Sequence, residues 1–250
     1  MKKCTVNYED VICWENLCAA WEEFVKGKRK KRDVQEFALH LADEMLALHG
    51  DFIDDVYIHG PYRRFAINDP KPRTIHKATV RDRLVHHAVH RQFYAYFAER
   101  FVIDSFSCQK GKGLHAGLNR FRTVARQISK NGTTICWVLK CDIRKFFASV
   151  DHDVLLELLG VHVADARLMA LLRNVIRSFS ASPGKGLPLG NLTSQLFANI
   201  YLHELDHFIK NRIGVRGYIR YADDFVILSD SREDLVEALP RIAKFLEVHL

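Results

Sequence analysis

Residues 220–228 constrain the fold of this chain more than any other stretch, because they read Arg-Tyr-Ala-Asp-Asp-Phe-Val-Ile-Leu. The pattern predicts two short apolar strands with two carboxylates, Asp223 and Asp224, at their junction. Carboxylates gathered at such a junction can hold hard cations. A Tyr-x-Asp-Asp tetrapeptide alone carries little information, so the interpretation depends on a third acid.

Asp142 supplies that acid. Residues 134–143 are almost continuously apolar and rich in β-branched and aromatic side chains, which predicts a buried strand. An acid at the end of a buried strand costs free energy to desolvate unless a cation meets it. Three acids delivered by a strand end and a hairpin tip can bind two Mg²⁺ about 4 Å apart, the arrangement that serves phosphoryl transfer.

A purely structural alternative gives these acids no chemistry. In that alternative Asp142 caps a helix, and Asp223 and Asp224 form a polar hairpin turn. Asp-Asp is not a favoured two-residue turn, however, because such turns usually contain Gly or Asn.

Farther along the chain, Asp151 stands in the position of an N-cap for an amphipathic stretch that ends at Gly160.

Basic side chains concentrate in the first half of the chain. The 250 residues carry a net charge of +7, from 37 Lys and Arg against 30 Asp and Glu. Residues 26–32 contain six basic groups, residues 63–91 contain eight against two acids, and residues 107–130 contain six against none. This distribution suits a polyanion held by one part of the chain and processed by another, although each run alone also fits a solvated surface. We expect His86 and His90, which lie among the arginines of the second run, to face the polyanion.

The sequence contains no signal peptide and no stretch of about 20 apolar residues. Its six cysteines include no Cys-x-x-Cys pair. We therefore expect a cytoplasmic protein with reduced thiols and no membrane contact.

Apolar residues recur at helical spacing in several segments, which predicts an α+β fold of long helices packed on a small antiparallel sheet. The strands of the sheet are expected at 134–143 and 216–229. Gly50 is expected to end the first helix, and Pro240 to kink the last helix or start it afresh. The helical segments are 37–48, 85–97, 114–128, 168–179, 197–208 and 235–246.

One motif indicates a different chemistry. Residues 203–207 read His-Glu-Leu-Asp-His and fit the His-Glu-x-x-His pattern of zinc metallopeptidases, in which His203 and His207 would bind Zn²⁺ and Glu204 would act as base. No clear third ligand accompanies the pattern, and Asp206 fills a slot that such enzymes usually keep small or apolar. Zinc peptidase is therefore the less favoured alternative.

Four motifs also follow one another along the chain. They are Lys71-Pro72-Arg73-Thr74-Ile75 with Asp82 to Ala88, then Ser105 to His115, then Asp142 to Phe147, and then Tyr221-Ala222-Asp223-Asp224. In this order they resemble the two fingers motifs and the two metal-binding palm motifs of reverse transcriptases of bacterial retroelements. The resemblance runs from about residue 17 to residue 250, and the four motifs together are far more specific than any one alone.

The resemblance implies the fingers and palm of a right-hand polymerase, with an N-terminal helical region and fingers at residues 1–130 and a palm at residues 131–250. Leu250 stands inside or just before the palm motif that normally offers a Lys, and before the helical thumb. We therefore expect a truncated enzyme without its thumb. Gln109 stands where related bacterial enzymes commonly have Arg, which shifts the expected triphosphate contact to Lys110 or Lys112.

The resemblance further implies an RNA-directed DNA polymerase that makes cDNA by two-metal nucleotidyl transfer. Asp142, Asp223 and Asp224 would hold two Mg²⁺, for which Mn²⁺ can substitute, and the backbone carbonyl of Ile143 would be an extra ligand. The implied partners are an RNA template, a DNA or RNA primer and deoxynucleoside triphosphates.

Other positions take their implied roles from the same resemblance. Lys71, Arg73 and Lys112 would contact the triphosphate or the template backbone without reading sequence. Phe147, five residues after Asp142, would be the bulky ring that excludes a 2′-hydroxyl, although a Phe near a strand end also fits a core position.

The loop at 187–195 indicates a subclass. Most reverse transcriptases have Gln-Gly and Ser-Pro where this chain has Leu189-Gly190 and Ser194-Gln195. The variant resembles the enzymes of diversity-generating retroelements, which copy a template-repeat RNA with errors at adenines and work with a small basic accessory protein. Physically, Leu189 replaces an amide that could hydrogen-bond the incoming nucleotide, which weakens discrimination. The structural alternative is a Gly turn before a helix capped by Thr193 or Ser194.

Two further functions stay open. A reverse transcriptase of a group II intron or another retroelement would share the chemistry but should carry Gln at position 189 and Pro at position 195. A nucleic-acid-binding protein without catalysis would share the basic surface, yet it would not need all three acids.

Overall fold

The computed structural model describes residues 3–68 and 72–249. The chain forms two compact units, and each is built from two stretches of sequence. The first contains Met1–Phe97 and Phe147–Leu196, and the second contains Ala98–Phe146 and Phe197–Leu250. Helices with two small antiparallel sheets confirm the predicted α+β class. The predicted division at residue 130 separates fingers from palm by function, and it stays a prediction.

Helices dominate the first unit. Its core is built from fully buried apolar side chains that include Leu17, Phe24, Leu48 and Leu84. Asp151 caps α8 as predicted, since its carboxylate accepts hydrogen bonds from the backbone N–H groups of Asp153 and Val154. The helices that lie wholly or mainly in this unit are α1 Tyr8–Ile12, α2 Trp14–Val25, α3 Arg32–Leu39, α4 Leu41–Ile53, α5 Val80–Ala98, α7 Phe146–Ser149, α8 His152–His162 and α9 Ala166–Arg177.

Two predicted helix ends in this unit were wrong. The segment expected to form one helix ending at Gly50 is broken at His40 into α3 and α4, and α4 continues through Gly50 to Ile53. Gly160 likewise lies inside α8. A glycine in a helix costs only about 1 kcal/mol relative to alanine, which buried neighbours such as Phe52 outweigh.

A two-stranded hairpin completes the first unit. Strand β1 (Arg63–Asn68) pairs with β2 (Pro72–Lys77) in a register that places Phe65 opposite Ile75. The predicted contact residue Lys71 lies outside the described residues.

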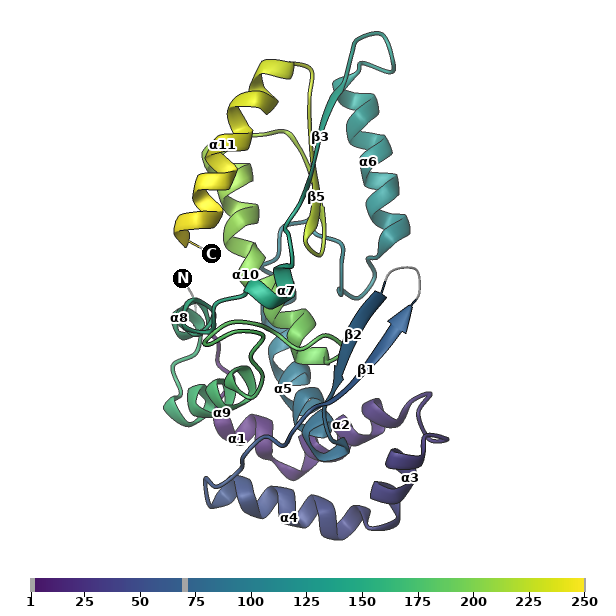
Figure 1. Ribbon diagram of the computed structural model, residues 1–250, viewed down its shortest axis with the longest axis vertical. Coiled ribbons are helices and arrows are strands. Elements are labelled where there is room, and N and C mark those ends of the chain that lie inside the picture. Colours follow the sequence, from purple (N-terminus) through teal and green to yellow (C-terminus); the bar gives the residue numbers. More distant parts are fainter. Residues whose placement is uncertain (1–2, 69–71, 250) are drawn as a thin grey trace. The chain divides into compact units, whose positions relative to one another are not determined.

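The second unit is built around a three-stranded antiparallel sheet of order β3-β5-β4. Helices α6 and α11 pack on this sheet (Figure 1). Ile219 and Leu228 on the sheet pack against Val124 of α6 in one buried cluster. The elements are α6 Leu114–Ile128, β3 Trp137–Asp142, α10 Leu192–His207, which begins in the first unit, the π-helix η1 Phe208–Ile213, β4 Gly217–Tyr221, β5 Asp224–Ser229 and α11 Arg232–His249.

Helix α11 runs through Pro240 without a break. Pro240 cannot donate to the carbonyl one turn earlier, but it is exposed, so water can satisfy that carbonyl. Ala238 and Ile242 are buried on either side and anchor the helix on the sheet, whereas Leu239 is 47% exposed. The expected restart at Pro240 is therefore wrong.

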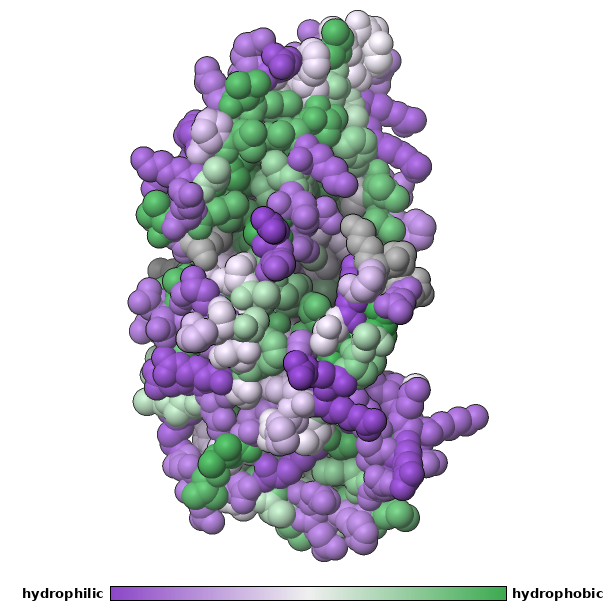
Figure 2. All heavy atoms as spheres, in the orientation of Figure 1, coloured by the Kyte–Doolittle hydropathy of each residue, from purple (hydrophilic) through white to green (hydrophobic). Residues whose placement is uncertain are grey.

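This unit also exposes apolar side chains. Trp137 and Val138 on β3 and Val236 on α11 are each at least 40% exposed. The prediction of a buried strand at 134–143 is therefore wrong, because β3 is an edge strand of the sheet and its side chains are exposed or half-buried. Figure 2 shows apolar residues gathered over this part of the surface. None of the helices within residues 3–68 and 72–249 has both the length and the apolar character needed to cross a bilayer.

Candidate active site

The structure brings two of the three predicted acids into direct opposition. Asp142, the last residue of β3, pairs with Asp224, the first residue of β5. Directly opposite residues on antiparallel strands carry their side chains on the same face of the sheet, about 4.5–5.5 Å apart at Cβ. Both side chains are exposed. Two carboxylates therefore meet at one end of the sheet, as the sequence predicted.

The turn beside them differs in detail from the predicted one. Its central residues are Ala222 and Asp223, because Asp224 already belongs to β5 and pairs with Tyr221. Ala222 has a φ of 56°, a left-handed conformation that costs an L-residue about 1–2 kcal/mol. A two-residue hairpin usually places glycine at this position. Asp223 is thus held in the loop between the strands, next to the opposed pair.

The donor set suits a divalent cation. In the part of the chain that the structure describes, the carboxylates of Asp142 and Asp224 form no hydrogen bond or ion pair. Like charges directly opposite on paired strands repel each other, and a bound cation would relieve this repulsion. Carboxylate oxygens are also the ligands that Mg²⁺ prefers. Among residues 3–68 and 72–249, however, no three His, Cys, Asp or Glu side chains are grouped closely enough to hold an ion, so Asp223 is not gathered with the pair.

The backbone carbonyl of Ile143, the predicted extra ligand, accepts a hydrogen bond of 3.2 Å from the N–H of Phe146. A carbonyl has a second lone pair, so this bond leaves one position for a cation. Lys145 in the same turn has a φ of 53°. The chain therefore bends sharply directly after Asp142.

A buried ion pair lies behind the turn, and sequence reasoning missed it. Arg220 and Asp206 are both fully buried, and the guanidinium donates to both carboxylate oxygens at 2.6 Å. Burial opposes the charged form of Arg220, but the Asp206 carboxylate outweighs it and raises the pKa of Arg220. Asp206, which made the His-Glu-x-x-His pattern atypical, is thus the ion-pair partner of Arg220 on β4. His203 and His207 contact each other through their Nε2 atoms at 3.0 Å.

Side chains of the second fingers motif form hydrogen bonds with backbone carbonyls of nearby residues in the same loop. The Gln109 amide donates to the backbone carbonyl of Ser105 at 2.9 Å. The Lys112 ammonium donates to the carbonyls of Ile103 at 3.1 Å and Ser105 at 2.8 Å. Desolvation lowers the pKa of Lys112. Lys110 is exposed. Lys112 thus orders this loop, and its predicted role at a triphosphate stays a prediction.

The loop at 187–191 is fastened to β2 in the first unit. The carbonyl of Leu189 accepts a hydrogen bond from the N–H of His76 at 2.9 Å, and the Asn191 amide donates to the carbonyl of His76 at 2.9 Å. Gly190 has a φ of 104°, and a Cβ there would lie 2.7 Å from Cγ2 of Ile75. The turn therefore requires glycine, and the half-buried side chain of Leu189 offers no hydrogen bond.

The remaining predicted residues of this unit fall on three elements. Arg73 is exposed on β2, and Phe147 is half-buried, with its carbonyl accepting from the N–H of Leu187. Ser194 is buried and Gln195 exposed in the first turn of α10. Because α10 begins before Ser194, the alternative in which Thr193 or Ser194 caps this helix is wrong.

The expectation that His86 faces a polyanion is also wrong. His86 is buried, and its ring nitrogens lie 3.1 Å from Nε2 of His59 and 2.6 Å from the hydroxyl of Thr193. Burial lowers the pKa of His86 to about 3. The neighbouring Arg81 pairs with Asp51. Helical spacing alone could not separate this buried network from a basic surface.

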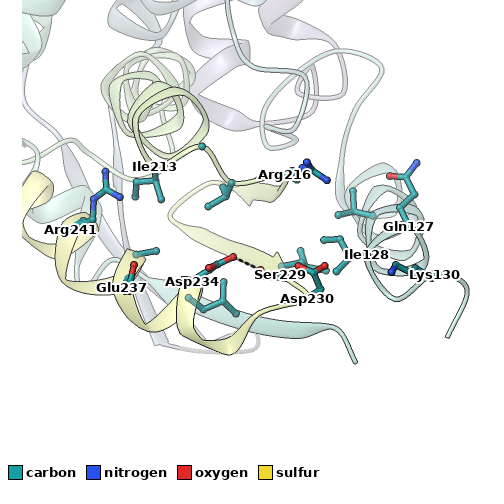
Figure 3. Close-up of a pocket in the computed structure, with 16 residues that line it drawn as sticks. Gln127, Ile128, Lys130, Ile213, Arg216, Ser229, Asp230, Asp234, Glu237 and Arg241 are labelled. Atoms are coloured by element: carbon teal, nitrogen blue, oxygen red, sulfur yellow. Dashed lines mark hydrogen bonds between the residues drawn. The ribbon is translucent and has the colours of Figure 1, made fainter. Parts of the chain in front are cut away.

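A cavity in the second unit lies away from the acids. It has a volume of about 650 Å³ and is lined by residues of α6, α11 and the far end of β5, with Ser229, Asp234 and Arg241 among them (Figure 3). Ser229 and Asp224 are the two ends of β5, so about 17 Å of strand separates them. The cavity is therefore not part of the candidate active site.

Comparison with known proteins identifies the family. The model of the family described as reverse transcriptase (RNA-dependent DNA polymerase) matches residues 67–249. Protein YkfC of Escherichia coli (strain K12) is 27% identical over 239 residues, covering 80% of this chain and 62% of YkfC. The group II intron-encoded protein LtrA of Lactococcus lactis subsp. cremoris is 28% identical over 165 residues, covering 62% of this chain and 26% of LtrA.

A solved structure shares the fold. A chain of a partial Cas6-RT-Cas1–Cas2 complex aligns with a TM-score of 0.55 at 19% identity, covering 96% of this chain and 42% of that one. The present chain thus spans less than two thirds of each of these relatives. The family match favours a polymerase over the peptidase alternative. Because it covers most of the chain and includes Asp142, Asp223 and Asp224, this chain belongs to the reverse transcriptase family.

Proposed function

We propose that the chain is the fingers and palm of an RNA-directed DNA polymerase whose catalytic acids are Asp142, Asp223 and Asp224. The observation that carries the proposal is the pairing of Asp142 with Asp224 across β3 and β5, beside the turn that contains Asp223. Two opposed carboxylates with no cationic partner among the described residues suit a divalent cation better than a structural role. The substrates are an RNA template, a DNA or RNA primer and deoxynucleoside triphosphates.

When bound, two Mg²⁺ ions would activate the primer 3′-hydroxyl and neutralise charge on the triphosphate. Asp142 and Asp224 would hold these ions from opposite strands, and Asp223 and the Ile143 carbonyl would complete the ligands. The strand register contributes by fixing the positions of two acids before any ligand arrives, which lowers the cost of ordering the site.

Basic side chains have separate tasks in this proposal. Arg73 and Lys110 are exposed and can contact phosphates of the template or the triphosphate. Lys71 has the same proposed role. Lys112 would reach a phosphate only by leaving the carbonyls that it now binds, so its first task is to order the loop. Phe147 is proposed to exclude ribonucleotides.

For the subclass, we infer a diversity-generating enzyme that is error-prone at template adenines and works with a small basic accessory protein. What supports this inference is the loop in which Leu189 and Gln195 replace the usual Gln and Pro. The backbone carbonyl of Leu189 is held by the N–H of His76. We therefore infer that the side chain at position 189, and not its backbone, determines the contact with the incoming nucleotide. Similarity to the intron-encoded LtrA favours the second candidate, a group II intron enzyme.

Primer extension on a defined RNA template tests the polymerase assignment. Parent protein should extend the primer with Mg²⁺ present, and Asp223→Asn should reduce extension by about a thousandfold, because a charged ligand worth several kcal/mol is lost. Asp230→Asn is the matched control, since Asp230 is an exposed acid directly beyond the other end of β5. Equal extension by parent and Asp223→Asn would refute the assignment of Asp223.

Sequencing of the cDNA tests the subclass. With the proposed accessory protein present, errors should concentrate opposite adenine, and Leu189→Gln should reduce them about tenfold if the restored contact contributes about 1.4 kcal/mol. Leu46→Gln, a change of the same kind at an exposed position of α4 outside the four motifs, should leave the error spectrum unchanged. A parent that copies adenine as accurately as the other bases would support the group II intron alternative instead.

A further inference from the structure

In the second unit, hydrogen bonds hold both the side chain and the backbone of Arg220. Its side chain is fully buried and makes the two bonds to Asp206, while its backbone N–H donates to the carbonyl of Asp104 and its own carbonyl accepts from the N–H of Phe106, both at 2.9 Å. The Tyr218 hydroxyl donates to the same Asp206 carboxylate at 2.5 Å. The position and orientation of the guanidinium are therefore fixed from both strand and helix.

The guanidinium nitrogen that does not face Asp206 contacts the turn of the candidate active site. It donates to the side-chain carbonyl of Asn199 at 3.1 Å and to the backbone carbonyl of Ala222 at 3.1 Å. Asn199 is itself oriented, because its amide donates to the carbonyl of Ser107 at 3.0 Å. A continuous chain of hydrogen bonds thus joins α10 to the loop that carries Asp223.

The turn needs such a support. Ala222 has the left-handed φ of 56° that alanine disfavours, and a conformation of this kind persists only where its surroundings enforce it. A buried ion pair, by contrast, contributes little net stability compared with apolar residues of similar volume. The specific gain from an arginine at this position is its planar set of donors, which can hold Asp206 and the turn carbonyl together.

Strand alternation places this support behind the acids. Arg220 is paired with Phe225, one position before the pairing of Tyr221 with Asp224, so its side chain lies on the opposite face of the sheet from the acids. Arg220 therefore cannot be a metal ligand, and it acts on the site only through the backbone of the turn.

We propose that Arg220, oriented by Asp206 and Asn199, is a positioning residue that fixes the Ala222 turn and thereby sets the spacing of Asp223 and Asp224 for metal binding. The proposal deepens the proposed function and rests on it. It also gives Asp206 a task that the peptidase-like motif did not suggest.

The test is Arg220→Lys, which keeps the positive charge but cannot bind Asp206 through two donors and reach Ala222 as well. Binding of Mn²⁺ to the protein alone, followed by electron paramagnetic resonance, should weaken about tenfold. The Mg²⁺ concentration that half-saturates primer extension should rise by a similar factor, and high Mg²⁺ should restore much of the rate.

Leu235→Ala is the matched control. Leu235 is buried on α11 near the Ser229 end of β5, the end away from the Ala222 turn, so this variant should lose stability in urea without a change in Mn²⁺ affinity. Equal Mn²⁺ affinity for Arg220→Lys and parent, with stability lowered as in the control, would reduce Arg220 to a structural residue and overturn the proposal.

Asn199→Ser provides a second arm if Arg220→Lys does not fold. It leaves the Arg220–Asp206 pair intact and removes one support of the nitrogen that holds Ala222, so Mn²⁺ affinity should fall about threefold. An unchanged affinity in this folded variant would also contradict the proposal. Because Mn²⁺ binding is measured without nucleic acid, failure of the polymerase assignment would show separately, as a parent that binds Mn²⁺ but does not extend a primer.

Discussion

Replacement of Gly190 by alanine should destabilise the first unit by two separable effects. The left-handed backbone at φ 104° would cost an alanine about 1–2 kcal/mol. The new Cβ would also lie 2.7 Å from Cγ2 of Ile75, and this methyl group has little freedom to move because it is attached to a branched Cβ. Overpacking of this kind costs about 1–3 kcal/mol. The free energy of unfolding should therefore fall by about 2–5 kcal/mol.

Urea unfolding followed by circular dichroism can separate the two effects. Gly184→Ala is the control for the backbone effect, because Gly184 has a φ of 71° with no atom within 4 Å of the new Cβ. It should lose only about 1–2 kcal/mol. In an Ile75→Ala background the clash is absent, so the cost of Gly190→Ala should fall to that of the control. If Gly190→Ala cost no more than Gly184→Ala in the parent background, the close packing of the loop on β2 would be refuted.

Two further predictions concern the turn and the buried histidine. Ala222→Gly should raise the free energy of unfolding by about 0.5–1 kcal/mol in urea titrations, because relief of the left-handed strain exceeds the extra chain entropy of glycine; a loss of stability would contradict the strained turn. The pKa of His86 is about 3 in the folded protein and about 6.5 unfolded, so below pH 6.5 the unfolded state binds the proton and stability should fall with pH. At pH 5 this group should lower the free energy of unfolding by about 2 kcal/mol. The free energy of unfolding of His86→Gln should therefore decline less than that of the parent between pH 7.5 and pH 5. An equal decline in both proteins would show that His86 is not the titrating group.

Local patterns predicted the elements that build the candidate site. The apolar run before Asp142 gave β3, and the run around Asp223 gave β4 and β5, because alternation and β-branched residues report directly on strand formation. The helical spacing likewise predicted α5 and α6. These features depend on neighbouring residues in the sequence, so they can be read from one sequence.

Features that depend on packing could not be read in this way. The helix break at His40 has no Gly or Pro to mark it, whereas Gly50 and Pro240 stand inside helices because buried neighbours hold them there. The ion pair of Arg220 with Asp206 joins residues on a strand and a helix. Their partnership follows from how α10 packs on the sheet, and the sequence near Asp206 suggested a zinc ligand pattern instead.

A double-mutant cycle on Asp142 and Asp224 tests the central claim most directly. The measurement is the rate of Mg²⁺-dependent primer extension on an RNA template by the parent, Asp142→Asn, Asp224→Asn and the double variant. If the opposed carboxylates hold the same metal centre, each single change should lower the rate about a thousandfold and the double change should lower it little further, because residues that act as a unit are not additive. If the two fold-reductions multiplied, the double variant would be about a millionfold slower than the parent, which would contradict a shared centre at the end of β3 and β5. A single variant as active as the parent would also contradict it.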